Sequence, residues 1–192
     1  LSAAMSLLEV GNVKVQRKVR ECLKICLCLP SNSVATIITE GGTACNEIAR
    51  RLLQLYAEMP QEFEDDEIIM HVTEFTHTRL ASWPGWQVKY SKLPEESQTF
   101  MKFMDWLFFC DWIAAKADPM VAESLATNVI EKLTVMVGPM IAKPNEQVAM
   151  AAMTYMTACV TQMRSPKLLA AFVSFLVGGQ RADQEGEPPT TL

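Results

Sequence analysis

The sequence predicts an all-α protein in which antiparallel helical hairpins stack as an armadillo- or HEAT-like α-solenoid segment. Apolar residues recur at helical spacing along most of the chain, and proline and glycine clusters interrupt them at intervals of one or two helix lengths. Few runs of β-branched residues alternate with polar ones, so we expect no strand. Of the 192 residues, 49% are hydrophobic and 20% are charged, which provides ample material for a core.

The first helical hairpin is expected between residues 13 and 42. Val13–Leu29 forms its longer helix, which Pro30 ends, and Val34–Thr39 forms a shorter helix that ends at two glycines. The apolar side of the longer helix contains Val15, Val19, Cys22, Leu23 and Cys26. Its polar side contains Lys14, Arg17, Lys18, Glu21 and Lys24. This helix is therefore expected to pack one face and to expose the other.

The next two helices are expected on either side of Pro60. Thr43 caps the first, whose apolar stripe consists of Ile48, Leu52, Leu55, Tyr56 and Met59. The acidic stretch Glu62–Glu67 suits the positive N-terminal end of the second, which runs to about Ala81. Ser82–Leu93 is the main irregular connection.

A helix that is apolar almost all round spans Phe100–Ala117 and should be the most buried element. Its large or apolar side chains are Phe103, Met104, Trp106, Leu107, Phe108, Cys110 and Ile113. Asp118 then caps a new helix whose first position is Pro119, the favoured arrangement at a helix start. Gly138 and Pro139 are expected to end that helix.

The last helix pair, Asn145–Met163 and Pro166–Val177 with Ser165 as cap, repeats the pattern of the first hairpin. Helix pairs that each bury a face on their neighbours are the units of armadillo and HEAT arrays, so residues 1–178 are predicted to form one solenoid segment. The polar residues 179–192 are expected to be a disordered tail or linker. Because the chain begins at Leu1 inside an apolar periodic run, we expect it to be part of a longer protein.

Charge and the length of apolar runs argue against two classes of partner. The net charge is −5 and the pI is about 5.1, so the chain has no overall basic footprint for nucleic acid. The uncharged run Gln147–Met163 has 17 residues, fewer than the ~20 that span a bilayer, and it includes threonines and glutamines. It is expected to be a buried helix of a soluble protein, so that any membrane association is indirect, through partners.

The six cysteines lie within helical apolar patterns rather than in a small disulfide framework, which favours a reducing, cytosolic setting. Cys22, Cys26 and Cys28 have no second cluster that would complete a tetrahedral zinc site. Buried thiols are the preferred interpretation.

The most enzyme-like group is Glu67, His71, Glu74 and His77, in which Glu74-x-x-His77 matches half of a di-iron carboxylate site. Such a site needs the motif twice, and the chain has only two histidines, so a solvated polar helix face is the alternative. Cys110 beside Asp111 has no histidine nearby to act as a base. No phosphate-binding loop or catalytic triad is apparent. The sequence therefore predicts a protein that is not an enzyme and has no cofactor.

Two features suit protein interaction. The cations Lys14, Arg17, Lys18 and Lys24 form a basic stripe that can meet an acidic partner or lipid headgroups, although a solvated helix face is the preferred interpretation. Trp83 and Trp86 stand in a loop, where they either anchor a partner or dock back onto the core. The candidate partner-contact residues are therefore Lys14, Arg17, Lys18, Trp83 and Trp86.

Several segments, taken together in order and spacing, resemble the central region of the FHIP family, also called retinoic-acid-induced-protein-16-like. The matching residues are Glu21, Leu23, Leu29 and Pro30; Arg51, Leu52, Leu55, Tyr56, Pro60 and Gln61; Phe103, Trp106, Cys110 and Asp111; and Gly178, Gln180 and Arg181. The chain departs from the pattern at Cys22, where a small residue is expected, and in the segment Trp83–Ser97. These departures leave the subfamily unassigned.

The resemblance implies a non-catalytic α-solenoid of the FTS–Hook–FHIP complex, which couples dynein, through Hook proteins, to endosomal or related vesicle membranes. It implies Hook proteins, FTS and a Rab GTPase as partners, and a cytoplasmic location at the periphery of endosomes or related vesicles. One alternative is a generic armadillo-like interaction scaffold unrelated to vesicle traffic, which the helical hairpins alone would support. Another is a carboxylate–histidine metalloenzyme built on a helical bundle.

Overall fold

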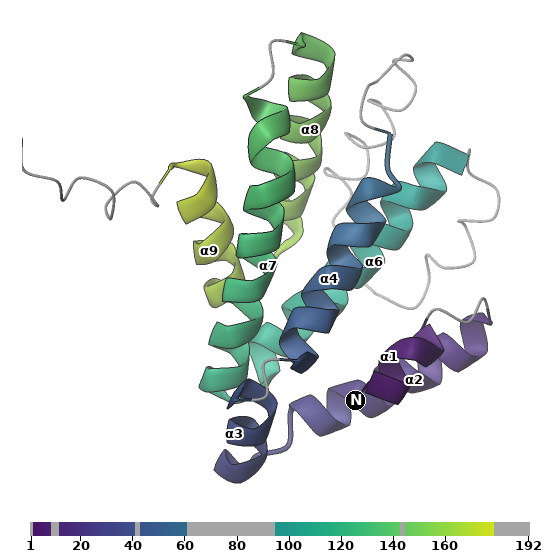
Figure 1. Ribbon diagram of the computed structural model, residues 1–192, viewed down its shortest axis with the longest axis vertical. Helices are drawn as coiled ribbons and strands as arrows, with labels where there is room; N and C mark the ends of the chain where they lie inside the picture. Colours follow the sequence, from purple (N-terminus) through teal and green to yellow (C-terminus); the bar gives the residue numbers. More distant parts are fainter. Residues whose placement is uncertain (1, 9–11, 41–42, 61–94, 143–144, 179–192) are drawn as a thin grey trace, which may run out of the picture.

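A computed structural model describes residues 2–8, 12–40, 43–60, 95–142 and 145–178 of the chain (Figure 1). This described part is all-helical, as predicted. Its helices are α1 (Ser2–Leu8), α2 (Val13–Leu27), α3 (Asn32–Glu40), α4 (Thr43–Ala57), α6 (Glu95–Lys116), α7 (Pro119–Ile141), α8 (Glu146–Gln162) and α9 (Pro166–Leu176). The helix expected to end near Ala81, the irregular segment Ser82–Leu93 and the tail 179–192 lie outside the described residues.

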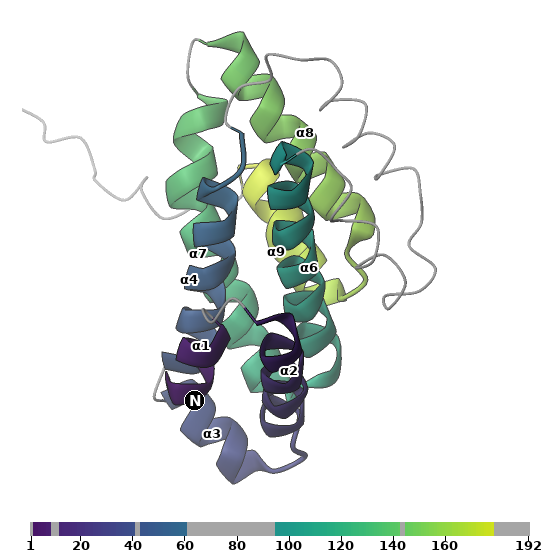
Figure 2. The same ribbon diagram turned by 90° about the vertical axis from the view of Figure 1, so that its right-hand side faces the viewer.

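Helix α7 lies at the centre of the packing. It contacts α3, α4, α6, α8 and α9, whereas α2 contacts mainly α1 and α6 at one end of the molecule (Figures 1 and 2). The axes of α2 and α3 are bent by 114° at their break, and α3 packs on α4 and α7. The described helices thus gather round α7, and the first expected hairpin opens into a corner.

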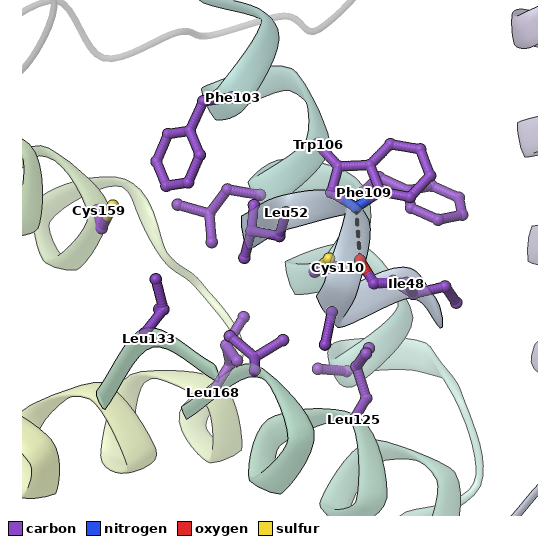
Figure 3. Close-up of a cluster of buried hydrophobic side chains, with 14 of the residues drawn as sticks. Ile48, Leu52, Phe103, Trp106, Phe109, Cys110, Leu125, Leu133, Cys159 and Leu168 are labelled. Carbon is purple, nitrogen blue, oxygen red and sulfur yellow. Dashed lines mark hydrogen bonds between the residues drawn. The ribbon is translucent and has the colours of Figure 1, made fainter. Parts of the chain in front are cut away.

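The core is formed by the faces that helical periodicity identified. The four apolar stripe residues that lie in α4 are buried, as is Met59 just after its end, and so are Val121, Leu125, Val129 and Leu133 of α7. Phe103 and Trp106 of α6 are also fully buried, and the close-up shows them beside α4 side chains such as Leu52 (Figure 3). Burying such large side chains is the main favourable contribution to folding, because each removes extensive apolar surface from water.

Trp106 connects α6 to α4 by a directed contact as well as by burial. Its indole Nε1 donates a hydrogen bond of 2.9 Å to the backbone carbonyl of Ile48 (Figure 3). Its ring also packs against Phe109, with 4.9 Å between ring centroids. A buried indole N–H needs an acceptor, so this bond fixes the position of α6 along α4.

Aromatic residues extend the core toward α8. Tyr155 of α8 meets Tyr56 of α4 edge-on at 6.1 Å and stacks on Phe100 of α6 at 5.6 Å. Its hydroxyl donates a 3.0 Å hydrogen bond to the carbonyl of Pro60. Both tyrosines have raised pKa values, chiefly because burial disfavours the phenolate.

Two of the helix caps that the sequence predicted, Asp118 and Ser165, are confirmed. Asp118 accepts a 2.9 Å hydrogen bond from the N–H of Met120, and Pro119 takes the first position of α7. Ser165 caps α9, and Asn12 and Asn145 cap α2 and α8 by accepting the first free N–H groups of those helices.

The prediction that Gly138 and Pro139 end the seventh helix is wrong, because α7 continues through both residues to Ile141. Proline lacks an N–H, so the carbonyl of Val135, four residues earlier, receives no helical hydrogen bond from it. Val135 is 75% exposed, and water can therefore hydrate that carbonyl. The N–H of Ala142 still bonds to the carbonyl of Gly138 at 3.1 Å, which completes the last turn.

Helix α9 begins on a contact with α6. The carboxylate of Asp111 accepts the backbone N–H of Arg164 at 3.1 Å and that of Ser165 at 2.8 Å. Burial raises the pKa of Asp111, and these two N–H donors act in the opposite direction. Asp111 therefore holds the turn between α8 and α9 against the middle of the molecule.

None of the described helices, taken alone, is long and apolar enough to cross a bilayer. The bent pair formed by Lys14–Leu27 and Asn32–Glu40 meets the length and composition criteria only when the two are taken together.

Trp106→Phe should lower the free energy of unfolding by about 2 kcal/mol, because it removes the bond to Ile48 and leaves a smaller side chain in a packed site. Trp112→Phe, at a ring that is 40% exposed on the same helix, is the matched control and should cost about 1 kcal/mol or less. Urea unfolding followed by circular dichroism measures both. Equal losses would contradict the role of Trp106.

Asp111→Ala should cost about 3 kcal/mol, since two backbone N–H groups at the start of α9 lose their acceptor. Asp118→Ala removes an exposed N-cap and should cost about 1 kcal/mol. The same unfolding experiment compares them, and a larger loss at Asp118 would refute the account of Asp111.

Candidate interaction surface on helix α2

The candidate site is the outer face of α2, the helix that carries three of the five predicted contact residues. Val19, Leu23 and Leu27 are buried on its inner face. Lys14, Arg17 and Lys18 are exposed, as the basic stripe predicted. Helix α2 lies at the edge of the molecule, with α1 and α6 as its principal neighbours (Figures 1 and 2).

Arg20 anchors the inner side of α2 to α6. Its guanidinium forms an ion pair with Asp105 and lies over the ring of Trp106, 5.2 Å from the ring centroid. The two charged side chains are largely buried, with 19% and 10% of their surface exposed. Arg20 therefore sits between a carboxylate and an aromatic face, the geometry in which a guanidinium gains both ionic and cation–π attraction.

One hydrogen bond joins Arg20 to Asp105, and each of the two side chains keeps a buried polar atom without a hydrogen-bond partner in the described part of the chain. Within the described part of the chain, neither Nε of Arg20 nor Oδ1 of Asp105 has a hydrogen-bond partner. Burial raises the pKa of Asp105 above its ordinary value, and Arg20 lowers it, so that the net shift is upward. A pair of this kind adds little net stability but makes the removal of one partner costly.

Lys24 does not belong to the exposed basic stripe, contrary to the prediction. Its ammonium lies 3.0 Å from the carboxylate of Glu21 and 5.0 Å from the centroid of the Trp112 ring. Only 19% of its side chain is exposed, and its ammonium faces an aromatic ring of α6. The stripe is therefore reduced to Lys14, Arg17 and Lys18.

The prediction that Cys22 and Cys26 are buried is wrong, because both are exposed. Arg20 and Lys24 turn toward α6, so the buried face of α2 is rotated away from these thiols. Ile25 and Leu29 are also turned outward, with 66% and 43% exposure. Cys28 is half-buried, and burial raises its pKa. The outer face of α2 is thus basic in its first half and apolar with two thiols in its second.

The remaining predicted groups do not join this surface. Trp83, Trp86 and the group Glu67, His71, Glu74 and His77 lie outside the described residues. Within the described ranges, no three His, Cys, Asp or Glu side chains come together in a way that could hold a metal ion.

Cys110 is fully buried, and its pKa is raised by burial, by neighbouring Asp111 and by Cys45. Its thiol is therefore kept protonated and away from solvent, which is the opposite of what a nucleophile requires. Asp111 is committed to the two N–H groups before α9.

Sequence reasoning missed Arg20 and Asp105 as partners. The sequence around each of the two residues did contain a sign of the contact. Arg20 follows Gln16 by one turn on the same side as Leu23 and Leu27, and Asp105 interrupts an otherwise apolar stretch of α6. A charge in such a stretch requires a counter-charge, although sequence alone does not identify it.

Arg20→Met should lower the free energy of unfolding by about 3 kcal/mol, because it leaves the Asp105 carboxyl buried without its counter-charge. Arg17→Met, one turn earlier on the exposed face, should cost less than about 0.5 kcal/mol. The double variant Arg20→Met with Asp105→Leu should recover much of the loss. Similar losses for Arg17→Met and Arg20→Met would contradict this assignment.

The loss in the free energy of unfolding caused by Arg20→Met should also depend on pH. Without the guanidinium, the pKa of Asp105 in the folded protein rises further above its ordinary value of 3.8. The folded state then binds the proton more tightly than the unfolded chain, so stability increases as pH falls through the raised pKa toward 3.8 and is lost as pH rises. Urea unfolding over this pH range should show a deficit that narrows in acid. A constant deficit would speak against an ionised, unpaired Asp105.

Comparison with known proteins identifies the relatives of this chain. The family described as retinoic acid induced 16-like protein matches residues 9–191. An FHIP family protein of Drosophila willistoni is 25% identical over 180 residues, covering 89% of this chain and 14% of that protein. One of Drosophila melanogaster is 26% identical over 175 residues, covering 86% of this chain and 15% of its own length. Since the family match extends over nearly the whole sequence, the chain belongs to the retinoic acid induced 16-like, or FHIP, family.

Proposed function

We propose that this chain is a non-catalytic scaffold of the FTS–Hook–FHIP complex. The observation that carries the proposal is family membership over residues 9–191, in an all-helical protein. In this role the chain binds Hook and FTS proteins, with a Rab GTPase as a further partner, and so links dynein to endosomal or related vesicle membranes.

The packing round α7 suits a scaffold. Five helices contact α7, and the aromatic residues Tyr56, Phe100 and Tyr155 tie α4, α6 and α8 together. A closely packed core of this kind is stiff, so two partners bound at separate places on it stay at a fixed distance from each other. Each partner then has a raised effective concentration for the other.

The armadillo-like solenoid is part of this proposal. Helices α7, α8 and α9 succeed one another across short breaks and contact each other, which is the relation that neighbouring helices have in a solenoid. The chain spans only 14% and 15% of the Drosophila relatives, and a long array of such layers would offer several binding surfaces. The Hook, FTS and Rab contacts of a complete protein are therefore proposed as shared along such an array.

Two sets of contact residues are proposed. Lys14, Arg17 and Lys18 meet an anionic surface, since they are exposed together on α2. Trp83 and Trp86 anchor a protein partner, since large aromatic side chains contribute most to interfaces. The complex would lie in the cytoplasm at the periphery of endosomes or related vesicles.

Affinity purification of the tagged chain from cells, with partners quantified by mass spectrometry, tests the proposal. Hook and FTS proteins should be recovered with the wild type. The variant Trp83→Ala with Trp86→Ala should reduce their recovery by about tenfold, because loss of two aromatic anchors costs at least a hot-spot contribution. Trp112→Ala is the control, an exposed tryptophan on α6 that should leave recovery unchanged.

Absence of Hook and FTS proteins from the wild-type sample would reject this function. Recovery of importins or kinases in their place would favour the alternative, a generic armadillo-like scaffold outside vesicle traffic. Equal effects of the Trp112 variant and the paired variant would reject Trp83 and Trp86 as anchors while leaving the complex intact.

A further inference from the structure

Two cysteines of α2 expose their thiols to solvent on one face of the helix, unlike the buried cysteines of this chain. Cys22 and Cys26 are exposed and are one helical turn apart on α2. Cys45, Cys110 and Cys159 are buried, the usual condition of a free cysteine. Their burial accounts for those three thiols as packing residues, but it leaves Cys22 and Cys26 without a structural role.

The exposed thiols are surrounded by exposed apolar side chains. Ile25 lies between them in sequence and is 66% exposed, and Leu29, one turn further on, is 43% exposed. Spacings of three and four residues place Cys22, Ile25 and Cys26 along the same outer side of α2, and Leu29 follows two residues after the helix ends at Leu27. This part of the helix therefore presents an apolar strip to its surroundings.

The first half of the same face is cationic. Lys14 and Lys18 are one turn apart, and Lys18 is one turn before Cys22, with Arg17 beside them. Among the described residues, no acidic side chain forms an ion pair with these three cations. The exposed carboxylate of Glu21 is paired with Lys24. Positive charge is therefore available on this face for an anionic surface.

We propose that Cys22 and Cys26 are sites of S-acylation, and that the acylated α2 lies flat on an anionic phospholipid surface. Cations beside an apolar strip that carries cysteines on an amphipathic helix are the combination that such anchoring requires. Lys14, Arg17 and Lys18 face the lipid phosphates, and Ile25 and Leu29 enter the boundary of the acyl chains. Cys22 and Cys26 are exposed on α2, which lies at the edge of the described part of the molecule (Figures 1 and 2).

The chemical step is a transthioesterification. The sulfur of Cys22 or Cys26 attacks the thioester carbonyl of a long-chain acyl-coenzyme A, and the carbon–sulfur bond to coenzyme A breaks. The proton from the cysteine thiol leaves with coenzyme A, which is released as its free thiol. No oxidant or reductant takes part. Hydrolysis of the new thioester by water releases the fatty acid and restores the cysteine thiol, so attachment can be switched off.

A single acyl chain holds a protein to a membrane only weakly and reversibly, so firm attachment takes a second signal, either another acyl chain or a cationic patch. Helix α2 offers both, since it has two exposed thiols and three exposed cations. Three cations close to an anionic leaflet strengthen binding by roughly tenfold or more in total, less at higher salt. The inference rests on the proposed function in one respect, namely that the chain works on the cytoplasmic side of vesicle membranes.

The test uses the tagged chain in cells fed an alkyne-bearing fatty acid. The label on the purified chain and the fraction of chain that sediments with membranes are measured, with and without hydroxylamine, which cleaves thioesters. The variant Cys22→Ser with Cys26→Ser is compared with Cys28→Ser, a half-buried cysteine at the end of the same helix. The charge variant Lys14→Glu, Arg17→Glu and Lys18→Glu is compared with Lys102→Glu, Lys116→Glu and Lys132→Glu, which carries the same change in net charge on α6 and α7.

A hydroxylamine-sensitive label should appear on the wild type and Cys28→Ser, and should fall at least about tenfold in the paired cysteine variant, because that variant lacks both thiols to which the acyl chain would be attached. The membrane fraction should fall with the paired cysteine variant and with the α2 charge variant, but not with either control. A wild type without label, or a label that persists without Cys22 and Cys26, would overturn the acylation sites. An α2 charge variant that keeps its membrane fraction but loses bound proteins would overturn the lipid assignment in favour of an acidic protein.

Hook and FTS proteins are quantified in the same samples, which separates the two proposals. Their recovery with an unlabelled wild type would overturn acylation and leave the scaffold function standing. A chain that carries the label but recovers neither Hook nor FTS proteins would overturn the scaffold function and leave acylation standing.

Discussion

Trp106 is the residue through which three helices hold one another in place. Its indole N–H binds the carbonyl of Ile48 on α4, and its ring carries the guanidinium of Arg20 from α2. It is itself fully buried in α6 beside Phe109. Because a hydrogen bond fixes direction and an aromatic face fixes distance, this single side chain sets where α2 and α4 lie on α6.

The contact at Arg20 also determines which residues of α2 meet the outside. A charged pair on the inner side is a poor source of net stability, since both groups give up hydration. It does select one rotation of the helix about its axis. With Arg20 and Lys24 turned inward, Cys22 and Ile25 are turned outward. The composition of the outer surface is thus a consequence of a polar contact beneath it.

Local chemistry made much of the fold predictable from sequence. Asp118 before Pro119 and Ser165 before Pro166 start helices because of short-range capping, which needs no knowledge of the rest of the chain. The apolar stripe of α4 was equally legible. The errors on α7 and on α2 have different causes. Solvent exposure at Val135, four residues before Pro139, lets α7 continue through the proline. On α2, the contacts of Arg20 and Lys24 with α6, far along the chain, go with the outward position of Cys22 and Cys26. The convergence of helices on α7 likewise depends on pairings that no local pattern contains.

The carboxylate of Asp111 has a consequence for the order of folding. It accepts N–H groups from a turn 53 and 54 residues further along the chain, so the start of α9 is held by α6 as well as by its own Ser165 cap. Closing so long a loop is entropically costly and is repaid only when α6 is already in place. The bonds from Asp111 to this turn therefore form only once α6 is in place, so the docking of α9 on α6 depends on a segment made much earlier in the chain.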